Sequence, residues 1–515
     1  MQPTFSNAFV HALPADPSTD TGTRQVHQAV YAFVRPTPVS NPKLLLCSPE
    51  TANLLGMTPE RVGSPEFTAV LAGNDVGAES KPYATVYGGH QFGHWAGQLG
   101  DGRAINLGEI AGYTLQLKGA GPTPFSRHAD GRAVLRSSIR EFLCSEAMFH
   151  LGIPSTRALS LVGSESLAVR DMFYDGHARQ EACAVVCRVS ESFLRFGHFE
   201  LPASRGEIDV LRQLADVAIG RHFPDIDPKA DTRYSQFFDA VCQSTARLLA
   251  GWMGVGFVHG VMNTDNMSIL GESIDYGPYG WLEKYELQWT PNTTDAEGRR
   301  YSYGNQPAIA QWNLARLANA LMPLIHDVEP LQNSLTGYNQ TFHAHWNRLL
   351  AAKLGLDENV LQTNPLCYQQ LVHVLSALEM DFNLFFDALT RSAQRGGDTG
   401  AEESESALLA CSYHPQPEAG VLRDWLALYR SLIDQSELPD RAASMRAANP
   451  VFILRNHLVQ DVIEAAEQGN LKPLQEIFTR LKTPYADSAD DARWVKKCPP
   501  ESMHRAGCSM LSCSS

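Results

Sequence analysis

The strongest constraint on the fold is a change of pattern near the middle of the chain. In the front part, short strand-like runs alternate with turns, and residues 88–103 hold six glycines in sixteen positions. In the back part, apolar residues recur at helical spacing over residues 235–253 and 306–325. This order predicts an α+β fold in which a strand-rich part precedes a helical part.

The strands of the front part are predicted from alternation and from their glycine-rich borders. Leu115 and Leu117 alternate with polar residues up to Lys118, so the apolar pair and Lys118 face opposite sides of one strand. A helix is expected near residues 134–151, where apolar side chains recur at helical spacing. The other strand-like runs cover residues 83–87, 104–110 and 182–190.

We divide the chain into four units on this basis. They are an N-terminal extension at 1–70, a strand-rich lobe at 71–205, a helical lobe at 206–390, and a helical extension with a cysteine tail at 391–515. No regular element is expected over residues 1–26, and the acidic run at 395–406 is expected to be a flexible loop. A strand-rich lobe followed by a helical lobe is the order of a protein kinase-like two-lobe fold.

The charge of the chain limits its partners. The formal net charge is −14, which argues against general binding of nucleic acid. Between residues 101 and 140, however, six basic side chains stand against three acidic ones. This local excess indicates either a solvated basic face or a site for a small polyanion such as a nucleoside triphosphate.

Targeting and metal signals are also informative. The sequence has no apolar run near the roughly 20 residues that a membrane helix needs, and its first residues lack the basic patch and apolar core of a secretory signal. The ten cysteines form no C-x-x-C pair and no zinc spacing. We therefore expect a cytoplasmic protein of a reducing compartment, with no membrane partner and no structural metal.

A polar loop after the first long helix of the back part reads HGVMNTDNMSILGESIDYG over residues 259–277. Protein kinases carry H-R-D-x-x-x-x-N followed by D-F-G. His259, Asn266 and Asp275 match this pattern, but Val261 stands where a kinase has its catalytic aspartate. The chain is therefore either an inactive kinase or an enzyme with a displaced base. Asp265 is the only carboxylate within residues 259–270, so it is the candidate base, although it could equally cap a turn.

Phosphate-binding candidates lie in the front part. Lys118 is predicted to lie on a strand just after the glycine-rich segment, where kinases place the lysine that holds nucleotide phosphates. Glu141 follows on the next helix and could pair with Lys118. Gly100 and Gly102, next to Arg103, would let the backbone approach a phosphate, although turns are equally rich in glycine.

Two further pairs remain open at this level. Asn266 and Asp275 offer an amide oxygen and a carboxylate, which are the ligands that Mg²⁺ takes beside nucleotide phosphates, but each could instead be an ordinary loop residue. Arg188 and Arg195 could form surface ion pairs, or they could clamp a terminal phosphate through bidentate hydrogen bonds.

With these residues in view, the chain resembles the selenoprotein O family of protein adenylyltransferases over nearly its whole length. The segments that carry the resemblance include YGGHQFGHWAGQLGDGR, LQLKGAGPTPFSRHADGRAVLRSSIRE, HGVMNTDNMSILGESIDYGPYG, NQPAIAQWNLARLA and NPVFILRNHLVQ. The resemblance implies a kinase-like fold that binds ATP in a flipped orientation. It also implies transfer of AMP to Ser, Thr or Tyr hydroxyls of other proteins, with release of pyrophosphate. Some members are described as using UTP with Mn²⁺, which adds uridylylation.

The resemblance also assigns roles by motif. Asp265 would be the proton acceptor, Glu141 would support Lys118, and Mg²⁺ or Mn²⁺ would be held by Asn266 and Asp275. Arg188 and Arg195 would hold the departing phosphates. The residues that would contact nucleotide are Gly100, Gly102, Arg103, Lys118, Asp130, Gly131, Arg188, Arg195 and Asp275.

The C-terminal tail departs from the family pattern in one respect. Many members end in a cysteine or selenocysteine third from the C-terminus, and Cys513 keeps that place. The family can form a disulfide from this tail to a cysteine in the activation-loop region, but residues 283–305 contain no cysteine here. Cys508 is the alternative partner for Cys513.

Two other functions stay open beside AMP transfer. One is a kinase or small-molecule phosphotransferase that moves the γ-phosphoryl group, because H-G-x-x-N-x-D-N loops also occur in antibiotic phosphotransferases. The other is a non-catalytic, nucleotide-binding pseudokinase. Val261 and the two arginines favour AMP transfer over the first, and the complete set of candidate residues disfavours the second.

Overall fold

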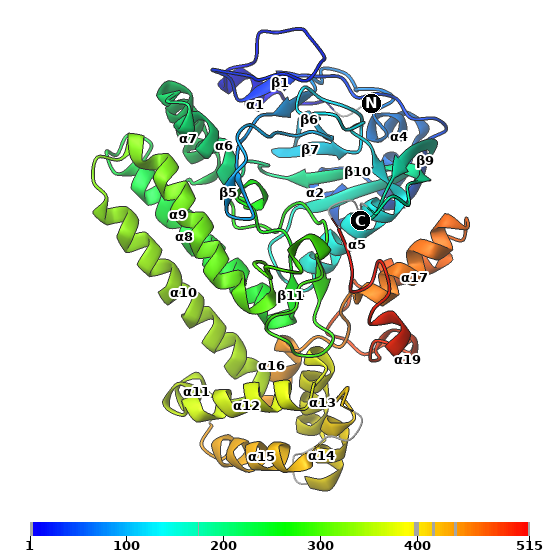
Figure 1. The fold of residues 1–515 in the computed structure, drawn as a ribbon, viewed down its shortest axis with the longest axis vertical. Coiled ribbons are helices and arrows are strands. Elements are labelled where there is room, and N and C mark those ends of the chain that lie inside the picture. Colours follow the sequence, from blue (N-terminus) through cyan, green and yellow to red (C-terminus); the bar gives the residue numbers. More distant parts are fainter. Residues whose placement is uncertain (1–3, 174, 396–400, 415–417, 437–439, 513–515) are drawn as a thin grey trace.

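The computed structural model describes residues 4–173, 175–395, 401–414, 418–436 and 440–512. Within them, one sheet-bearing region and many helices form a mixed α/β architecture, with the sheet at one end of the long axis (Figure 1). The strands are β1 (Tyr31–Phe33), β2 (Lys43–Cys47), β3 (Tyr83–Thr85), β4 (His90–Gln91), β5 (His94–Trp95), β6 (Ala104–Ile110), β7 (Tyr113–Lys118), β8 (Ala133–Val134), β9 (Arg157–Arg170), β10 (Arg179–Ser190), β11 (Phe257–Val258) and β12 (Gly280–Trp281).

Helices occur in both parts of the chain, and the longest ones, α8 and α10, lie in the back part. Those up to residue 222 are α1 (Ala8–Ala12), α2 (Pro49–Leu54), α3 (Pro59–Val62), α4 (Pro65–Leu71), α5 (Leu135–His150), α6 (Phe196–Ser204) and α7 (Ile208–His222). Those beyond are α8 (Arg233–Val255), α9 (Gln306–Leu321), α10 (Glu329–Leu354), α11 (Glu358–Thr363), α12 (Pro365–Ala377), α13 (Phe382–Gln394), α14 (Ala401–Leu409), α15 (Ala419–Ile433), α16 (Arg441–Ala448), α17 (Asn456–Glu467), α18 (Lys472–Arg480) and α19 (Asp491–Trp494).

The main sheet has eight antiparallel strands. Its order is β1-β3-β6-β7-β10-β9-β2, and β8 pairs with β10 beside this path. Strands β1 and β2 come from the segment expected as an N-terminal extension, and they occupy the two edges of the sheet. That segment therefore shares the sheet with the residues that follow it.

The two faces of the sheet pack against different helices, as alternation along the strands requires. Leu115 and Leu117 of β7 lie in a core cluster with Phe67 and Val70 of α4. On the other face, α5 packs against β9 and β10. Lys118 points away from Leu117 along β7, so the lysine projects on the side of the sheet where α5 lies.

The helical region is organised around α8, α9 and α10, which run side by side away from the sheet (Figure 1). Gly256 ends α8 with a left-handed backbone, φ +74°, which stops the helix and turns the chain into β11. The polar loop that starts at His259 follows directly. Helices α11 to α15 form the far end of the molecule, and α17 and α19 pack along the side (Figure 1).

Three details differ from the sequence-based expectations. The first 26 residues include the short helix α1, and the acidic run expected as a loop enters α14 at Ala401. Part of that run, residues 396–400, lies outside the described residues. The long strand β9 was not predicted, because Gly163, Ser164 and Ser166 interrupt its apolar run, although the strand pairs with β10 over most of its length.

Candidate active site

A cavity of about 770 Å³ lies where the glycine-rich segment of the sheet region faces the polar loop of the helical region. The predicted site residues that line it are Gly100, Gly102, Arg103, Lys118, Asp130, Gly131, Arg188, Arg195, Asp265, Asn266 and Asp275. Glu141 supports the cavity from behind rather than lining it. The structure thus brings together residues that are spread over 176 positions of sequence, and their roles at the site stay predictions.

Lys118 is held by an ion pair with α5. The strand directs its side chain to the α5 side of the sheet, where its Nζ lies 2.6 Å from Oε2 of Glu141. Both side chains are buried, at 8% and 3% exposed. The pairing expected from the sequence is therefore present, and it fixes the ammonium group at the cavity wall.

Asp275 is the point where three cations meet. Its Oδ1 accepts hydrogen bonds from Nζ of Lys118 at 2.7 Å and from Nη1 of Arg188 at 2.9 Å, and its Oδ2 accepts one from Nη1 of Arg195 at 2.9 Å. Although burial opposes ionisation, these cations hold the pKa of Asp275 well below its ordinary value. The residue also has a left-handed backbone, φ +65°, which non-glycine residues seldom adopt.

Arg188 and Arg195 are buried, not surface residues. Both side chains are 2% exposed. Arg188 lies opposite Gln116 in the β10–β7 register and also pairs with Glu141 at 2.9 Å. Arg195 precedes α6 and donates to the backbone carbonyl of Asp265 at 2.8 Å. The alternative of two surface ion pairs is therefore wrong, and both guanidinium groups face the cavity.

Asp265 is a buried carboxylate with spare acceptor capacity. Its Oδ2 accepts a hydrogen bond from Nε2 of Gln91 at 3.1 Å, while its Oδ1 has no hydrogen-bond partner among the described residues. Burial raises the pKa of Asp265 to about 6, against the lowering effects of Gln91 and Arg195. A carboxylate with a free oxygen and a pKa near neutrality is suited to accept a proton.

His259 and Asn266 each hold the polar loop through a contact with a backbone carbonyl oxygen. Nε2 of His259 contacts the carbonyl oxygen of Ile274 at 2.9 Å, so the imidazole ties the start of the loop to the residue before Asp275. Nδ2 of Asn266 donates to the carbonyl of Val261 at 3.0 Å, which leaves the amide oxygen of Asn266 for another partner.

The donor set suits a hard divalent cation. Lys118 and Arg188 both bond to Oδ1 of Asp275, whereas Oδ2 has a single partner and keeps one acceptor position. With the amide oxygen of Asn266, this gives two oxygen ligands from neighbouring loops, the kind of ligand that Mg²⁺ and Mn²⁺ prefer. The residues present therefore fit the expected metal.

Two of the glycines at the cavity have no room for a side chain. Gly100 has φ +146°, and a Cβ there would lie 2.6 Å from Cγ of Phe125. A Cβ on Gly131, φ +69°, would lie 2.1 Å from the backbone carbon of Gly121. Asp130 lines the cavity and forms a two-pronged ion pair with Arg170 at 2.6 and 2.8 Å, and its contact with nucleotide stays a prediction.

Sequence reasoning missed several wall residues. Gln91 holds Asp265, and Tyr87 lies under the guanidinium group of Arg195, 4.9 Å from its carbon. Arg170 belongs to the unpredicted strand β9. The GGH run before Gln91 was the sequence signal that could have indicated this wall. A Cβ on Gly89 would lie 2.8 Å from Oδ1 of Asp265, so the carboxylate fits only because residue 89 is a glycine.

Known proteins are similar to this chain over almost its whole length. The family model of protein adenylyltransferase SelO matches residues 18–482. The chain belongs to the SelO family of protein adenylyltransferases. Among its relatives, proteins named protein nucleotidyltransferase YdiU from Aromatoleum aromaticum, Xanthomonas campestris pv. campestris (strain B100) and Rhodopirellula baltica are 51%, 50% and 48% identical. Each alignment covers 99% of this chain and 99% of the relative.

Membership of the SelO family confirms the sequence-based resemblance and the prediction of an enzyme of the nucleotidyltransferase class. Among the described residues, no helix combines the length and apolar character that crossing a bilayer requires. Cys513, the tail cysteine of the family pattern, lies outside the described residues. Cys508 is described, buried and not in a disulfide.

Proposed function

We propose that this SelO-family enzyme transfers AMP from ATP, or UMP from UTP, to a Ser, Thr or Tyr hydroxyl of a protein substrate. The observation that carries the proposal is Asp265, a carboxylate with one unpaired oxygen that lines a cavity walled by buried cations, while Val261 occupies the kinase base position. The substrate oxygen attacks the α-phosphorus, and its proton passes to Asp265. The bond from the α-phosphorus to the bridging oxygen breaks, and pyrophosphate leaves with the electron pair.

The cations supply the charge that a leaving pyrophosphate needs. Lys118, Arg188 and Arg195 already converge on one carboxylate, Asp275, so their donors are positioned before nucleotide binds. Preorganised donors stabilise developing charge without the cost of reorganisation. We assign phosphate binding to these three residues, and nucleotide contacts to Gly100, Gly102, Arg103, Asp130 and Gly131.

Asn266 and Asp275 would hold Mg²⁺ or Mn²⁺ through their oxygen atoms. The metal, when bound, neutralises phosphate charge and polarises the phosphoryl group under attack. Glu141 contributes by holding Lys118 from the α5 side, while Asp275 holds the same ammonium group from the polar loop. The low pKa of Asp275 keeps it ionised, and so ready to bind a cation, at any physiological pH.

The proposal includes the kinase-like arrangement. The sheet region would act as the nucleotide-binding lobe at 71–205, and the helical region as the second lobe at 206–390, with the extensions at 1–70 and 391–515. The placement of the cavity between the glycine-rich segment and the polar loop supports this division. We further propose that the enzyme works in the cytoplasm.

Labelled ATP tests the proposal directly. The full-length protein is incubated with Mg²⁺ or Mn²⁺, a protein acceptor mixture, and ATP labelled at either the α or the γ position. Label from the α position should enter protein, and label from the γ position should not. Transfer of γ label alone would make the protein a kinase, and binding without any transfer would make it a scaffold. Asp265→Ala is the matched control for non-enzymatic labelling.

A further inference from the structure

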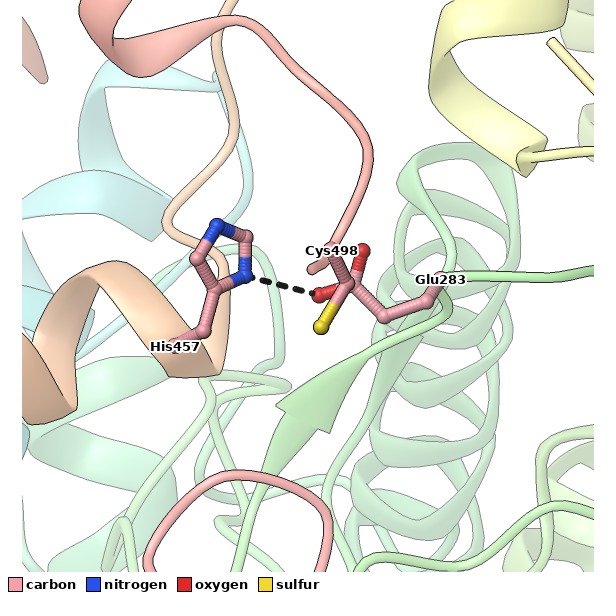
Figure 2. Close-up of side chains that lie close together, drawn as sticks. All are labelled: Glu283, His457 and Cys498. Atoms are coloured by element: carbon pink, nitrogen blue, oxygen red, sulfur yellow. Dashed lines mark ion pairs between the residues drawn. The ribbon is translucent and has the colours of Figure 1, made fainter. Parts of the chain in front are cut away.

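A second cluster of metal-ligating side chains lies outside the active-site cavity. Glu283, His457 and Cys498 come from three separate segments and point toward one another (Figure 2). Their ligand atoms all lie within 4.8 Å of one another. Glu283 follows β12, His457 lies in the first turn of α17, and Cys498 lies in the C-terminal tail. None of the three has a part in the proposed transfer.

His457 is the observation that points to a ligand. It is 2% exposed, and neither of its ring nitrogens makes a hydrogen bond with any other described residue. Its Nδ1 lies 3.4 Å from Oε1 of Glu283, an ion-pair distance (Figure 2). A buried imidazole without hydrogen bonds is costly, because both nitrogens lose the water that they would bind in solvent. A metal ion would satisfy one of them.

Two carboxylates and one guanidinium group lie at the cluster. Arg455 pairs with Glu283 and, at 2.8 Å, with Asp381, so one guanidinium group faces two carboxylates. Asp381 is fully buried and Arg455 is 2% exposed. Glu283 and Asp381 therefore share one guanidinium group, and Glu283 also lies at ion-pair distance from His457.

We propose that Glu283, His457 and Cys498 form a binding site for Zn²⁺. Thiolate, imidazole and carboxylate are all zinc ligands, and the thiolate selects zinc over Mg²⁺. Ligand atoms of a tetrahedral zinc site lie about 3.4–3.8 Å apart, so side-chain shifts on the order of 1 Å would close the cluster. Binding displaces the thiol proton of Cys498 to solvent, and the sulfur then donates its electron pair to the metal.

The surroundings leave room for a fourth ligand. A cavity of about 330 Å³ lies beside the three side chains, and His504 and Cys508 are among its lining residues. Tyr413 links Cys498 to Asp381. Its hydroxyl accepts a hydrogen bond from the backbone N–H of Cys498 at 2.9 Å and donates to Asp381 at 3.0 Å. The backbone of Cys498 is therefore fixed relative to the carboxylate pair before metal arrives.

The site would connect the C-terminal tail to the catalytic loop. Leu511 of the tail pairs with the segment at 291–293, where its N–H donates to the carbonyl of Pro291 at 2.9 Å. Asn292 in that segment donates to the carbonyl of Gly260 at 3.0 Å, within the loop that carries Asp265. Zinc bound at Cys498 would therefore stabilise the C-terminal tail. This tail contacts the segment at 291–293, which in turn contacts the active-site loop.

Metal content tests the proposal without an activity measurement. The full-length protein is stripped with a chelator, dialysed against Zn²⁺ in an excess of Mg²⁺, freed of loose metal, and analysed by mass spectrometry for zinc. About one Zn²⁺ per chain is expected for the wild type and for Cys411→Ser, a buried cysteine outside the cavity. Cys498→Ser and His457→Ala should each lose most of it. Less than a tenth of an equivalent in the wild type, or full zinc in both variants, would overturn the proposal.

A spectroscopic measurement keeps the test decisive if a variant fails to fold. Co²⁺ is loaded in place of Zn²⁺ into the stripped wild type and into Cys411→Ser. A thiolate-to-cobalt charge-transfer band and tetrahedral ligand-field bands should appear in both, and they should disappear when Zn²⁺ is added. An octahedral spectrum without a thiolate band would contradict the assignment. Where Cys498→Ser is folded by circular dichroism, it should lack the charge-transfer band.

Discussion

Lys118 and Asp275 form an ion pair of 2.7 Å although 157 positions separate them in the sequence. Lys118 is also held by Glu141 at 2.6 Å, so the ammonium group lies between a carboxylate of the sheet region and one of the polar loop. This contact joins the two halves of the cavity before any nucleotide is present. Asp275 neutralises three cations in this structure, and in the proposed reaction it would also hold the metal.

Asp275→Ala should abolish AMP transfer, and Asn266→Ala should weaken it strongly. Without Asp275, the metal would lose its carboxylate ligand, and Arg188 and Arg195 would lose a shared ion-pair partner in a buried site. We expect a lower melting temperature for Asp275→Ala as well. Initial rates over a series of Mg²⁺ concentrations provide the measurement, and near wild-type rates for Asp275→Ala at every concentration would remove the metal assignment.

Asp265→Ala should separate chemistry from binding. A general base contributes on the order of 10²–10⁴ in rate, so transfer should fall by about that factor. Affinity for ATP–Mg²⁺ should stay within a few-fold of wild type, whereas Lys118→Ala should weaken binding because its charge faces the phosphates. Calorimetric titration beside a transfer assay makes the comparison. Unchanged transfer in Asp265→Ala would disprove the base, and lost binding would place Asp265 among the metal ligands.

The pH profile should report the ionisation of Asp265. Only the carboxylate form can accept a proton, and burial raises its pKa to about 6. The rate constant kcat/KM should therefore rise with pH through about 6 and level off above it, with a roughly tenfold loss per pH unit on the acid side. The residual activity of Asp265→Asn should lack this limb. A limb of the same midpoint in the variant would assign the titration to another group.

Asp265→Asn should make the protein more stable at pH 8. A carboxylate whose pKa is raised by folding favours the folded state below its unfolded pKa, near 4, and this advantage is lost as pH rises through about 6. At pH 8 the charged form therefore costs on the order of 1–3 kcal/mol. Thermal melting should show a higher transition for the variant at pH 8 and a much smaller difference near pH 4. An equal difference at both pH values would point to packing as the cause.

Gly131→Ala should damage the cavity wall far more than Gly112→Ala. Both glycines have a left-handed backbone, at φ +69° and +86°, so both substitutions carry backbone strain. A Cβ at Gly131 would overlap the backbone carbon of Gly121 at 2.1 Å, whereas nothing lies within 4 Å of a Cβ at Gly112. We expect an extra loss of about 1–3 kcal/mol and weaker nucleotide binding for Gly131→Ala. Equal melting temperatures for the two variants would show that the backbone around Gly131 shifts at no cost in stability.

Much of the active site follows from local sequence. Alternation in β7 places Lys118 opposite Leu115 and Leu117, and helical spacing places α5 next in order. The loop motif supplied Asp265, Asn266 and Asp275 because their spacing along the chain is itself the signal. The burial of Arg188 and Arg195 did not follow, because nothing local in their sequence distinguishes a buried arginine from a solvated one.

The zinc cluster shows the limit of the same reasoning. The ten cysteines carry no zinc spacing, so the sequence predicted no structural metal. Glu283, His457 and Cys498 meet only because α17 and the tail fold back onto the segment after β12. Zinc motifs are visible in sequence when the ligands lie within a few residues of one another, and here the separations are 174 and 41 residues.

The sequence was enough to predict a strand-rich part before a helical part, the family, and the residue types that the proposed transfer needs. These properties depend on local periodicity and on motifs whose members lie close together in the chain. The sequence did not show which charges share a carboxylate, which oxygen of Asp265 has no hydrogen-bond partner, or that Asp130 pairs with Arg170. These are consequences of burial and of contacts between distant segments, because the energy of a charge depends on what surrounds it in space and not on its neighbours in sequence.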